Sequence, residues 1–214
     1  MKINGTGTQQ ILSLFYNNSL FQHKFNKKSC AYTSLSNIIY VNDNPQTVNY
    51  YVNNLVSQIN TIKLLWYNSL VNCSCMFLDL KNIIEMDLSN FDFSKVTGMR
   101  GMFANCSSLT SINLSNLNTI KLKDKHGTFL RCYSLQSIIF NNFYTSNVTD
   151  MSNLFYECNS LTSLNLNTFD TSQVTDMYGM FYRCLSLKQL NLQNFDTSSC
   201  YNMGATFLQC SSLT

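Results

Sequence analysis

The sequence has few charged residues and lacks long apolar runs. Asp, Glu, Lys and Arg make up 12% of its 214 residues, and the formal net charge is +3. A nucleic-acid-binding domain usually carries a dense basic face, so we expect no nucleic-acid partner. No apolar segment approaches the roughly 20 residues of a bilayer-spanning helix, which predicts no membrane span in this chain. The segment from Met1 to Gln10 also lacks the apolar core of a signal peptide.

Residues suited to catalysis, phosphate binding or metal binding are scarce as well. His23 and His126 are the only histidines, and the sequence places no nucleophile and orienting acid beside either. There is no glycine-rich phosphate loop, and Cys73 and Cys75 lack a second cysteine pair at the spacing of a zinc site. We therefore expect a protein that is not an enzyme and that has no cofactor and no metal.

What the sequence does contain is a repeat of 26 residues. Hydrophobic residues make up 45% of the chain, which is enough for a sizeable core. Three columns recur at the 26-residue step: Phe103, Phe129, Phe155, Phe181 and Phe207; Cys106, Cys132, Cys158, Cys184 and Cys210; Leu109, Leu135, Leu161, Leu187 and Leu213. A fixed period of about 20 to 50 residues is typical of proteins whose units bury their apolar faces by stacking on one another.

Each unit changes its hydrophobic spacing halfway along. Met177, Met180, Phe181 and Cys184 lie at i, i+3, i+4 and i+7, the spacing of one face of an α-helix of about two turns. Residues 187 to 192 follow the pattern L-x-x-L-x-L, which predicts a strand that stacks in parallel on the next unit. The expected fold class is α/β: a right-handed leucine-rich-repeat solenoid with a parallel sheet on one face and short helices on the other.

Two units carry a resemblance to a known family. They read L-T-S-L-N-L-N-T-F-D-T-S-Q-V-T-D-M-Y-G-M-F-Y-R-C from Leu161 to Cys184, and M-D-L-S-N-F-D-F-S-K-V-T-G-M-R-G-M-F-A-N-C from Met86 to Cys106. These strings resemble the BspA-like leucine-rich-repeat surface proteins, including the mycoplasma-type lipoprotein repeat, and the resemblance extends from Ile83 to Thr214. It implies an extracellular or cell-surface protein used in adhesion, or in contacts with host proteins and neighbouring cells.

The chain divides into two predicted regions. Residues 59–214 form the solenoid of 26-residue units, which we expect to be C-terminally incomplete because Thr214 stands just inside a further strand. Residues 1–58 lack the repeat. Ile38 to Val41 and Val48 to Val52 read as strands around a turn that holds Pro45, the only proline. We expect a small β-rich N-terminal cap, the alternative being a fragment of an unrelated upstream domain.

Two features inside the units call for an explanation. The Cys column lies on the inward face, where free cysteine behaves as a small hydrophobe, so we expect packing rather than disulfides. Lys125 takes the place of an inward Met. A charged amine in a core is costly, so we expect the chain to shift locally and the side chain to extend outward.

The exposed face of the predicted sheet is the candidate partner-binding face. Its ten residues are Glu85, Asp87, Ser111, Asn113, Ser137, Ile139, Ser163, Asn165, Gln189 and Asn191. Such an extended face suits hydrogen bonds with a few apolar anchors. The expected function is protein or glycan binding, with adhesion at a cell surface implied by the resemblance. The alternative is an intracellular interaction scaffold in the cytoplasm, which the absent signal peptide and free thiols favour.

Overall fold

The computed structural model describes residues 1–4, 7–10, 38–41, 43–46, 51–55, 59–65, 69–115 and 117–214. Its strands are β1 (Lys2–Asn4), β2 (Gly7–Gln10), β3 (Ile38–Val41), β4 (Asn44–Gln46), β5 (Tyr51–Leu55), β6 (Ile59–Leu65), β7 (Ile83–Asp87), β8 (Ser111–Asn113), β9 (Ser137–Ile139), β10 (Ser163–Leu164) and β11 (Gln189–Leu190).

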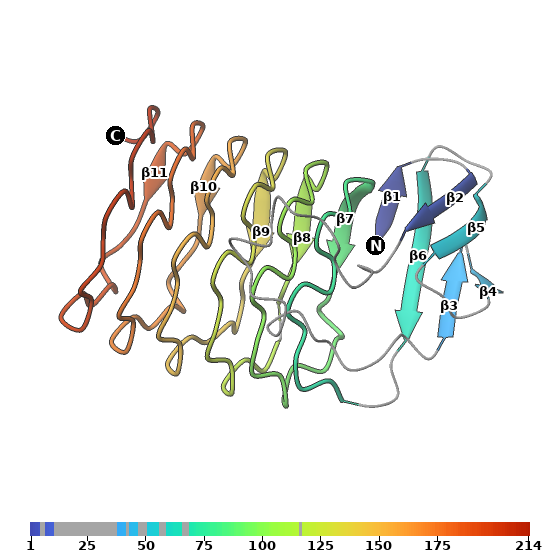
Figure 1. Ribbon diagram of the computed structural model, residues 1–214, viewed down its shortest axis with the longest axis horizontal. Helices are drawn as coiled ribbons and strands as arrows, with labels where there is room; N and C mark the ends of the chain where they lie inside the picture. Colours follow the sequence, from blue (N-terminus) through green and yellow to red (C-terminus); the bar gives the residue numbers. More distant parts are fainter. Residues whose placement is uncertain are drawn as a thin grey trace, which may run out of the picture.

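The main sheet changes from antiparallel to parallel pairing along its seven strands. Their order is β4-β3-β6-β1-β7-β8-β9. Pairing is antiparallel as far as the β1–β7 pair, whereas β7, β8 and β9 run parallel at a register of 26 residues. The strands β10 and β11 form a second parallel pair at the same register. Figure 1 shows the units from β7 to β11 side by side in chain order, which confirms the predicted parallel stacking.

The N-terminal strands agree with the sequence only in part. The predicted strand from Ile38 to Val41 is β3, which pairs with β4 across a tight turn at Asp43. The second predicted strand falls partly outside the described residues. Strand β6 is also present, but it runs antiparallel to β1 and β3, and β1 separates it from β7. Parallel pairing within the main sheet therefore begins at β7, whereas on the turn side Asn72 already forms a parallel bridge with Gly98.

The predicted short helices are wrong: no helix occurs in the described ranges. The segment from Met99 to Cys106 is instead a run of overlapping β-turns. Met102 N donates to Met99 O at 3.0 Å, three residues back, whereas Phe103 N donates to Thr128 O of the next unit at 2.9 Å. This alternation repeats along the stack, so about half of the turn-segment N–H groups bond between units rather than within one.

Left-handed backbone at every fourth residue explains why a helix cannot form. Gly101 has φ 56° and Asn105 has φ 60°, and both recur at the 26-residue step in neighbouring units. A non-glycine residue in this conformation costs roughly 1–2 kcal/mol. The hydrogen bonds to the next unit offset that cost. In an α-helix the same N–H groups would bond within their own unit and could not bond to the next one.

The core follows the repeat closely. The Phe column forms a continuous stack, in which Phe155 lies 5.7 Å from Phe129 and 5.5 Å from Phe181 between ring centroids, with interplanar angles of 5° and 15°. Met, Cys and Leu residues of the inward columns pack beside these rings, and they are buried from Cys73 to Leu187. The predicted inward face is therefore confirmed, although turns and not helices carry it.

The Cys column serves packing, as predicted. Cys106, Cys132, Cys158 and Cys184 are free and buried. Each thiol donates to a Phe carbonyl of the preceding unit, as Cys158 Sγ does to Phe129 O at 3.2 Å. Burial raises the pKa of the Cys106 thiol to about 12. Cys75 differs from this column because it is disulfide-bonded, and its partner lies outside the described residues.

Lys125 corrects another expectation, because its side chain does not extend outward. It is 1% exposed and occupies the core position of the inward Met in the adjacent units. Its Nζ has no hydrogen-bond partner and lies 4.0 Å from the ring centroid of Phe143 and 5.0 Å from that of Phe169. The backbone stays in register because Lys125 N still donates to Asp150 O of the next unit, at 3.4 Å.

Candidate functional site

The predicted binding face is aligned by strand pairing. Glu85, Ser111 and Ser137 pair successively across β7, β8 and β9, and Ser163 pairs with Gln189 across β10 and β11. A second row runs beside them: Asp87, Asn113, Ile139, Asn165 and Asn191. The ten residues therefore share one face of the stack.

The second row is largely committed to local structure. Asp87 Oδ1 accepts a hydrogen bond from Ser89 N at 2.9 Å, and these serine bonds lower the pKa of the Asp87 carboxyl. Asn113, Asn165 and Asn191 use Oδ1 in the same way, each accepting from the N–H two residues on. These side chains close the turn after each strand. Ile139, which cannot do so, is 46% exposed.

The first row keeps its side chains available. Ser137, Ser163 and Gln189 are exposed. Glu85 pairs with Lys2 at 2.6 Å, so the strand β1 partly neutralises this end of the row. The face thus offers hydroxyl and amide groups with one apolar residue, Ile139, among them.

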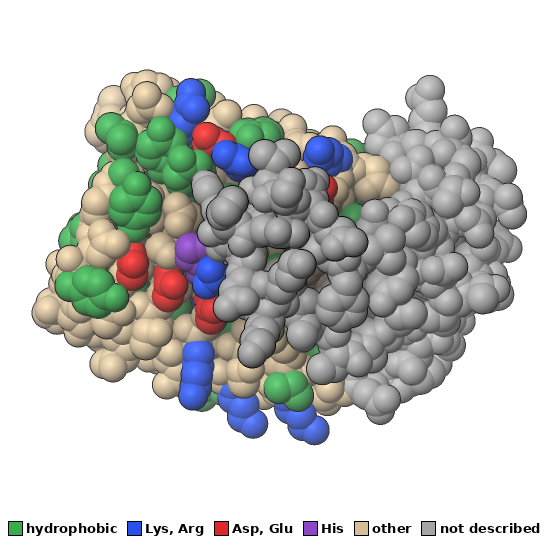
Figure 2. Space-filling view, viewed as in Figure 1, with side chains coloured by type: hydrophobic (Ala, Val, Ile, Leu, Met, Phe, Trp, Pro, Cys, Tyr) green, Lys and Arg blue, Asp and Glu red, His purple; other side chains and the backbone are tan. Residues whose placement is uncertain are grey.

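A ladder of acids on the turn side was not among the predicted site residues. Asp124, Asp150 and Asp176 are joined by parallel bridges. His126 Nδ1 lies 2.6 Å from Ser152 Oγ and 3.7 Å from Asp150 Oδ2. Figure 2 shows acidic side chains in a row beside a histidine on this face. The 26-residue step brings these residues together and could have revealed them.

This Ser, His and Asp group lacks the geometry of a hydrolytic triad. Ser152 Oγ donates to Asp150 Oδ1 at 2.5 Å, so the acid contacts the hydroxyl directly. In a triad the serine and the acid bind opposite nitrogens of the imidazole, whereas one nitrogen of His126 faces both here. Within the part of the chain that the structure describes, no three His, Cys, Asp or Glu side chains converge as metal ligands.

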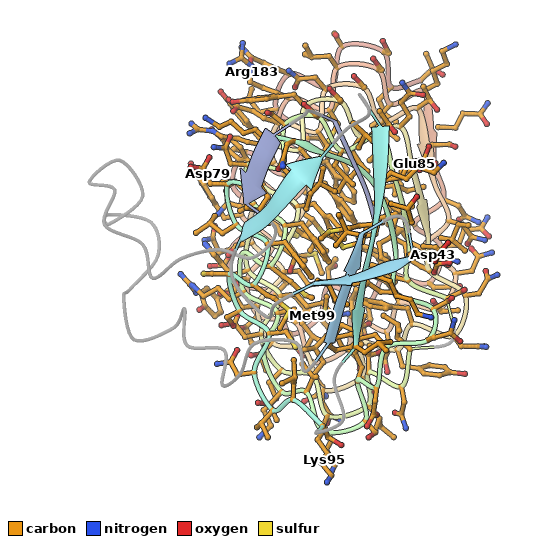
Figure 3. All side chains as sticks on the ribbon, turned by 90° about the vertical axis from the view of Figure 1, so that its right-hand side faces the viewer. Asp43, Asp79, Glu85, Lys95, Met99 and Arg183 are labelled. Atoms are coloured by element: carbon orange, nitrogen blue, oxygen red, sulfur yellow. The ribbon has the colours of Figure 1, made fainter. Side chains whose placement is uncertain are left out.

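A surface of tyrosine and arginine lies elsewhere on the turn side and was also missed. Tyr156 and Tyr182 stack with centroids 4.4 Å apart and an interplanar angle of 15°. Beside them the Glu157 carboxylate lies between Arg131, at 2.9 Å, and Arg183, at 3.5 Å. In Figure 3, Arg183 lies on the side of the molecule opposite Glu85, so this surface faces away from the sheet.

A cavity of about 470 Å³ lies where β6 and β7 meet the first turns. Ile62, Phe77 and Met86 contribute its apolar wall, and Asp87 and Asp92 lie at its rim. The Oδ1 atoms of both acids accept hydrogen bonds from backbone N–H groups two residues on. Both carboxylates beside the cavity therefore take part in closing local turns.

Comparison with known proteins gives one result. A family model described as "Mycoplasma protein of unknown function, DUF285" matches residues 46–143 and again residues 128–214. No curated protein matches the chain, and no solved structure does either. Nor does the described part of the chain contain a helix long and apolar enough to cross a membrane.

Proposed function

The chain belongs to the DUF285 family of mycoplasma proteins, and from this premise we propose that it is a non-catalytic repeat protein that binds protein or glycan ligands at a cell surface. The proposal includes the finer description of the fold as a right-handed solenoid of the BspA-like leucine-rich-repeat type, with adhesion as its role. The twofold family match supports the mycoplasma-type repeat.

The observation that carries the proposal is the row of exposed polar side chains on the parallel sheet. Ser137, Ser163 and Gln189 are exposed and are held at fixed positions by strand pairing. A rigid, nearly uncharged row of hydroxyls and amides suits hydrogen bonding to an extended ligand.

The cysteines bear on the compartment. The disulfide at Cys75 supports an oxidising environment outside the cell. The seven free cysteines of the described residues favour the second candidate, an intracellular interaction scaffold. A thiol titration of the unfolded, unreduced protein from its native source separates the two. Seven reactive thiols support the surface protein, whereas nine support the scaffold.

Binding is tested directly with a double variant, Ser163→Arg with Gln189→Arg. The assay measures the affinity of the folded chain for a panel of purified extracellular-matrix proteins and for a glycan array. We expect at least one ligand to bind the wild type and to bind the double variant at least ten times more weakly. Ser146→Arg, at an exposed turn position, is the matched control. No binding by the wild type overturns the proposed function, and equal binding by the double variant overturns the choice of face.

A further inference from the structure

One outward column of the turn segments is apolar in every unit. It consists of the residues that directly follow the stacked phenylalanines: Leu78, Ala104, Leu130, Tyr156, Tyr182 and Leu208. Outward positions of a stacked repeat normally carry polar residues, because they face water. A continuous apolar column on the outside is therefore a feature to be explained by contact with something else.

The column passes from buried to open along the stack. Leu78, Ala104 and Leu130 are at most 2% exposed and form, with Cys75, an apolar cluster separate from the main core. Tyr156 packs against this cluster but is partly exposed, Tyr182 is partly exposed, and Leu208 is 54% exposed. The open part therefore continues an apolar column whose other end is buried in the folded chain.

The arrangement of the rings favours a polypeptide over a sugar. A pyranose packs flat against the face of an aromatic ring. Tyr156 and Tyr182 stack on each other, so each has one face occupied by its neighbour. Tyr133 lies beside them, since its hydroxyl donates to Glu157 Oε2 at 3.3 Å, and its side chain is 37% exposed. Tyrosine and arginine are among the residues enriched at the centres of protein interfaces.

The charges beside the rings define the partner further. Arg131 and Arg183 share the single carboxylate of Glu157, which leaves one positive charge in excess. The Glu157 side chain is 12% exposed, whereas that of Arg183 is 46% exposed and 3.5 Å from the carboxylate. The Arg183 guanidinium therefore has donors available for a second carboxylate.

We propose that Tyr156, Tyr182 and Leu208, with Arg183 at their side, dock an extended polypeptide segment of a partner protein that carries apolar side chains next to a carboxylate. The proposal rests on the proposed function only in treating the chain as a binding protein. It assigns a different face, opposite the sheet.

The test is a selection from a displayed library of random 12-residue peptides on the folded chain. We expect enriched peptides that combine aromatic or aliphatic residues with Asp or Glu. Their dissociation constants should rise at least tenfold for Tyr182→Ser and for Arg183→Glu, a second variant that keeps the ring stack. The Ser163→Arg, Gln189→Arg double variant should bind them as the wild type does.

Two results would overturn the proposed docking surface. Enrichment that is no greater on the wild type than on a Tyr156→Ser, Tyr182→Ser variant overturns the docking surface. So does loss of peptide binding on the sheet-face variant alone, which would instead support the face named under the proposed function. Circular dichroism of each variant confirms that the fold is kept, and Arg183→Glu decides the matter if the tyrosine variants unfold.

Discussion

Replacing Lys125 with methionine should stabilise the protein. Nζ of Lys125 is buried without a hydrogen-bond partner, and the residues at the same position of the adjacent units, Met99 and Met151, are fully buried methionines. An unpaired polar group in a protein core costs about 1–3 kcal/mol, and a charged one costs more. Burial accordingly lowers the pKa of Lys125 well below its ordinary value.

The expected gain from Lys125→Met is about 2–4 kcal/mol, from removal of the amine and the better apolar contacts of the thioether. For a chain of this size that raises the melting temperature by about 5–15 °C. Calorimetry and urea unfolding measure it. Lys121→Met, at an exposed position of the same unit, is the control and should change stability by less than about 0.5 kcal/mol.

The stability difference between the wild type and Lys125→Met should depend on pH. The unfolded chain binds a proton at Lys125 below about pH 10.4, whereas the folded chain resists it, so the wild type loses stability relative to Lys125→Met as pH falls from about 10. The difference should widen by up to about 1.4 kcal/mol per pH unit until the folded-state pKa is reached. A variant that is no more stable than the wild type, or a difference that does not change with pH, refutes the buried, unpaired amine.

Three further changes test the packing. In the Lys125→Met background, the free energy of unfolding should fall as pH rises above about 8.5. The reason is that thiols of the unfolded chain ionise there, while burial raises the pKa of Cys106 in the folded chain to about 12. Urea titrations at pH 8 and pH 10 measure this, and a higher stability at pH 10 would contradict it. Phe155→Ala should cost about 3–5 kcal/mol in urea unfolding, since the ring is stacked on both sides, and a loss below about 1 kcal/mol argues against the Phe stack. Gly179→Ala should cost about 1–2 kcal/mol in thermal unfolding, because φ is 61° and the new Cβ would lie 3.0 Å from Asn153 Oδ1. Gly204→Ala, which lacks the positive φ, should cost less, and the reverse order contradicts the backbone assignment.

The 26-residue period was sufficient to predict which residues face inward and which strands pair. A repeat that stacks unit on unit places residue i beside residue i+26, so Phe129, Phe155 and Phe181 had to form one column. The parallel register of Ser111 with Ser137 follows from the same step. These predictions needed no knowledge of the local backbone.

The local backbone was not predictable from spacing alone. Apolar residues at i, i+3, i+4 and i+7 share one side of an α-helix, but they also share one side of consecutive turns with left-handed residues such as Gly101 and Asn105. The hydrogen-bond partners decide between the two, and they lie in another unit. The burial of Lys125 has the same origin. Lys125 N bonds to the next unit, and the flanking Asp124 O and His126 O accept bonds from the preceding unit, so the backbone is held in place.

The open tyrosine surface was hidden for a different reason. Tyr156 and Leu130 occupy equivalent positions of neighbouring units, yet Tyr156 is partly exposed and Leu130 is buried. The sequence marks the column as apolar, but it does not say where the burial ends.

A pair of engineered cysteines tests most directly whether 26-residue units stack in register, on which both proposed faces depend. Ser163 and Gln189 are directly paired across β10 and β11, and neighbouring strands bring paired Cα atoms within the range that a disulfide bridges. Oxidation of Ser163→Cys with Gln189→Cys, followed by peptide mass mapping, should give a 163–189 disulfide in most molecules. Ser163→Cys with Lys188→Cys should give little, because Lys188 precedes β11 and is not the residue paired with Ser163. Efficient bridging of 163 with 188 but not with 189 would contradict the register and with it the alignment of every column described above.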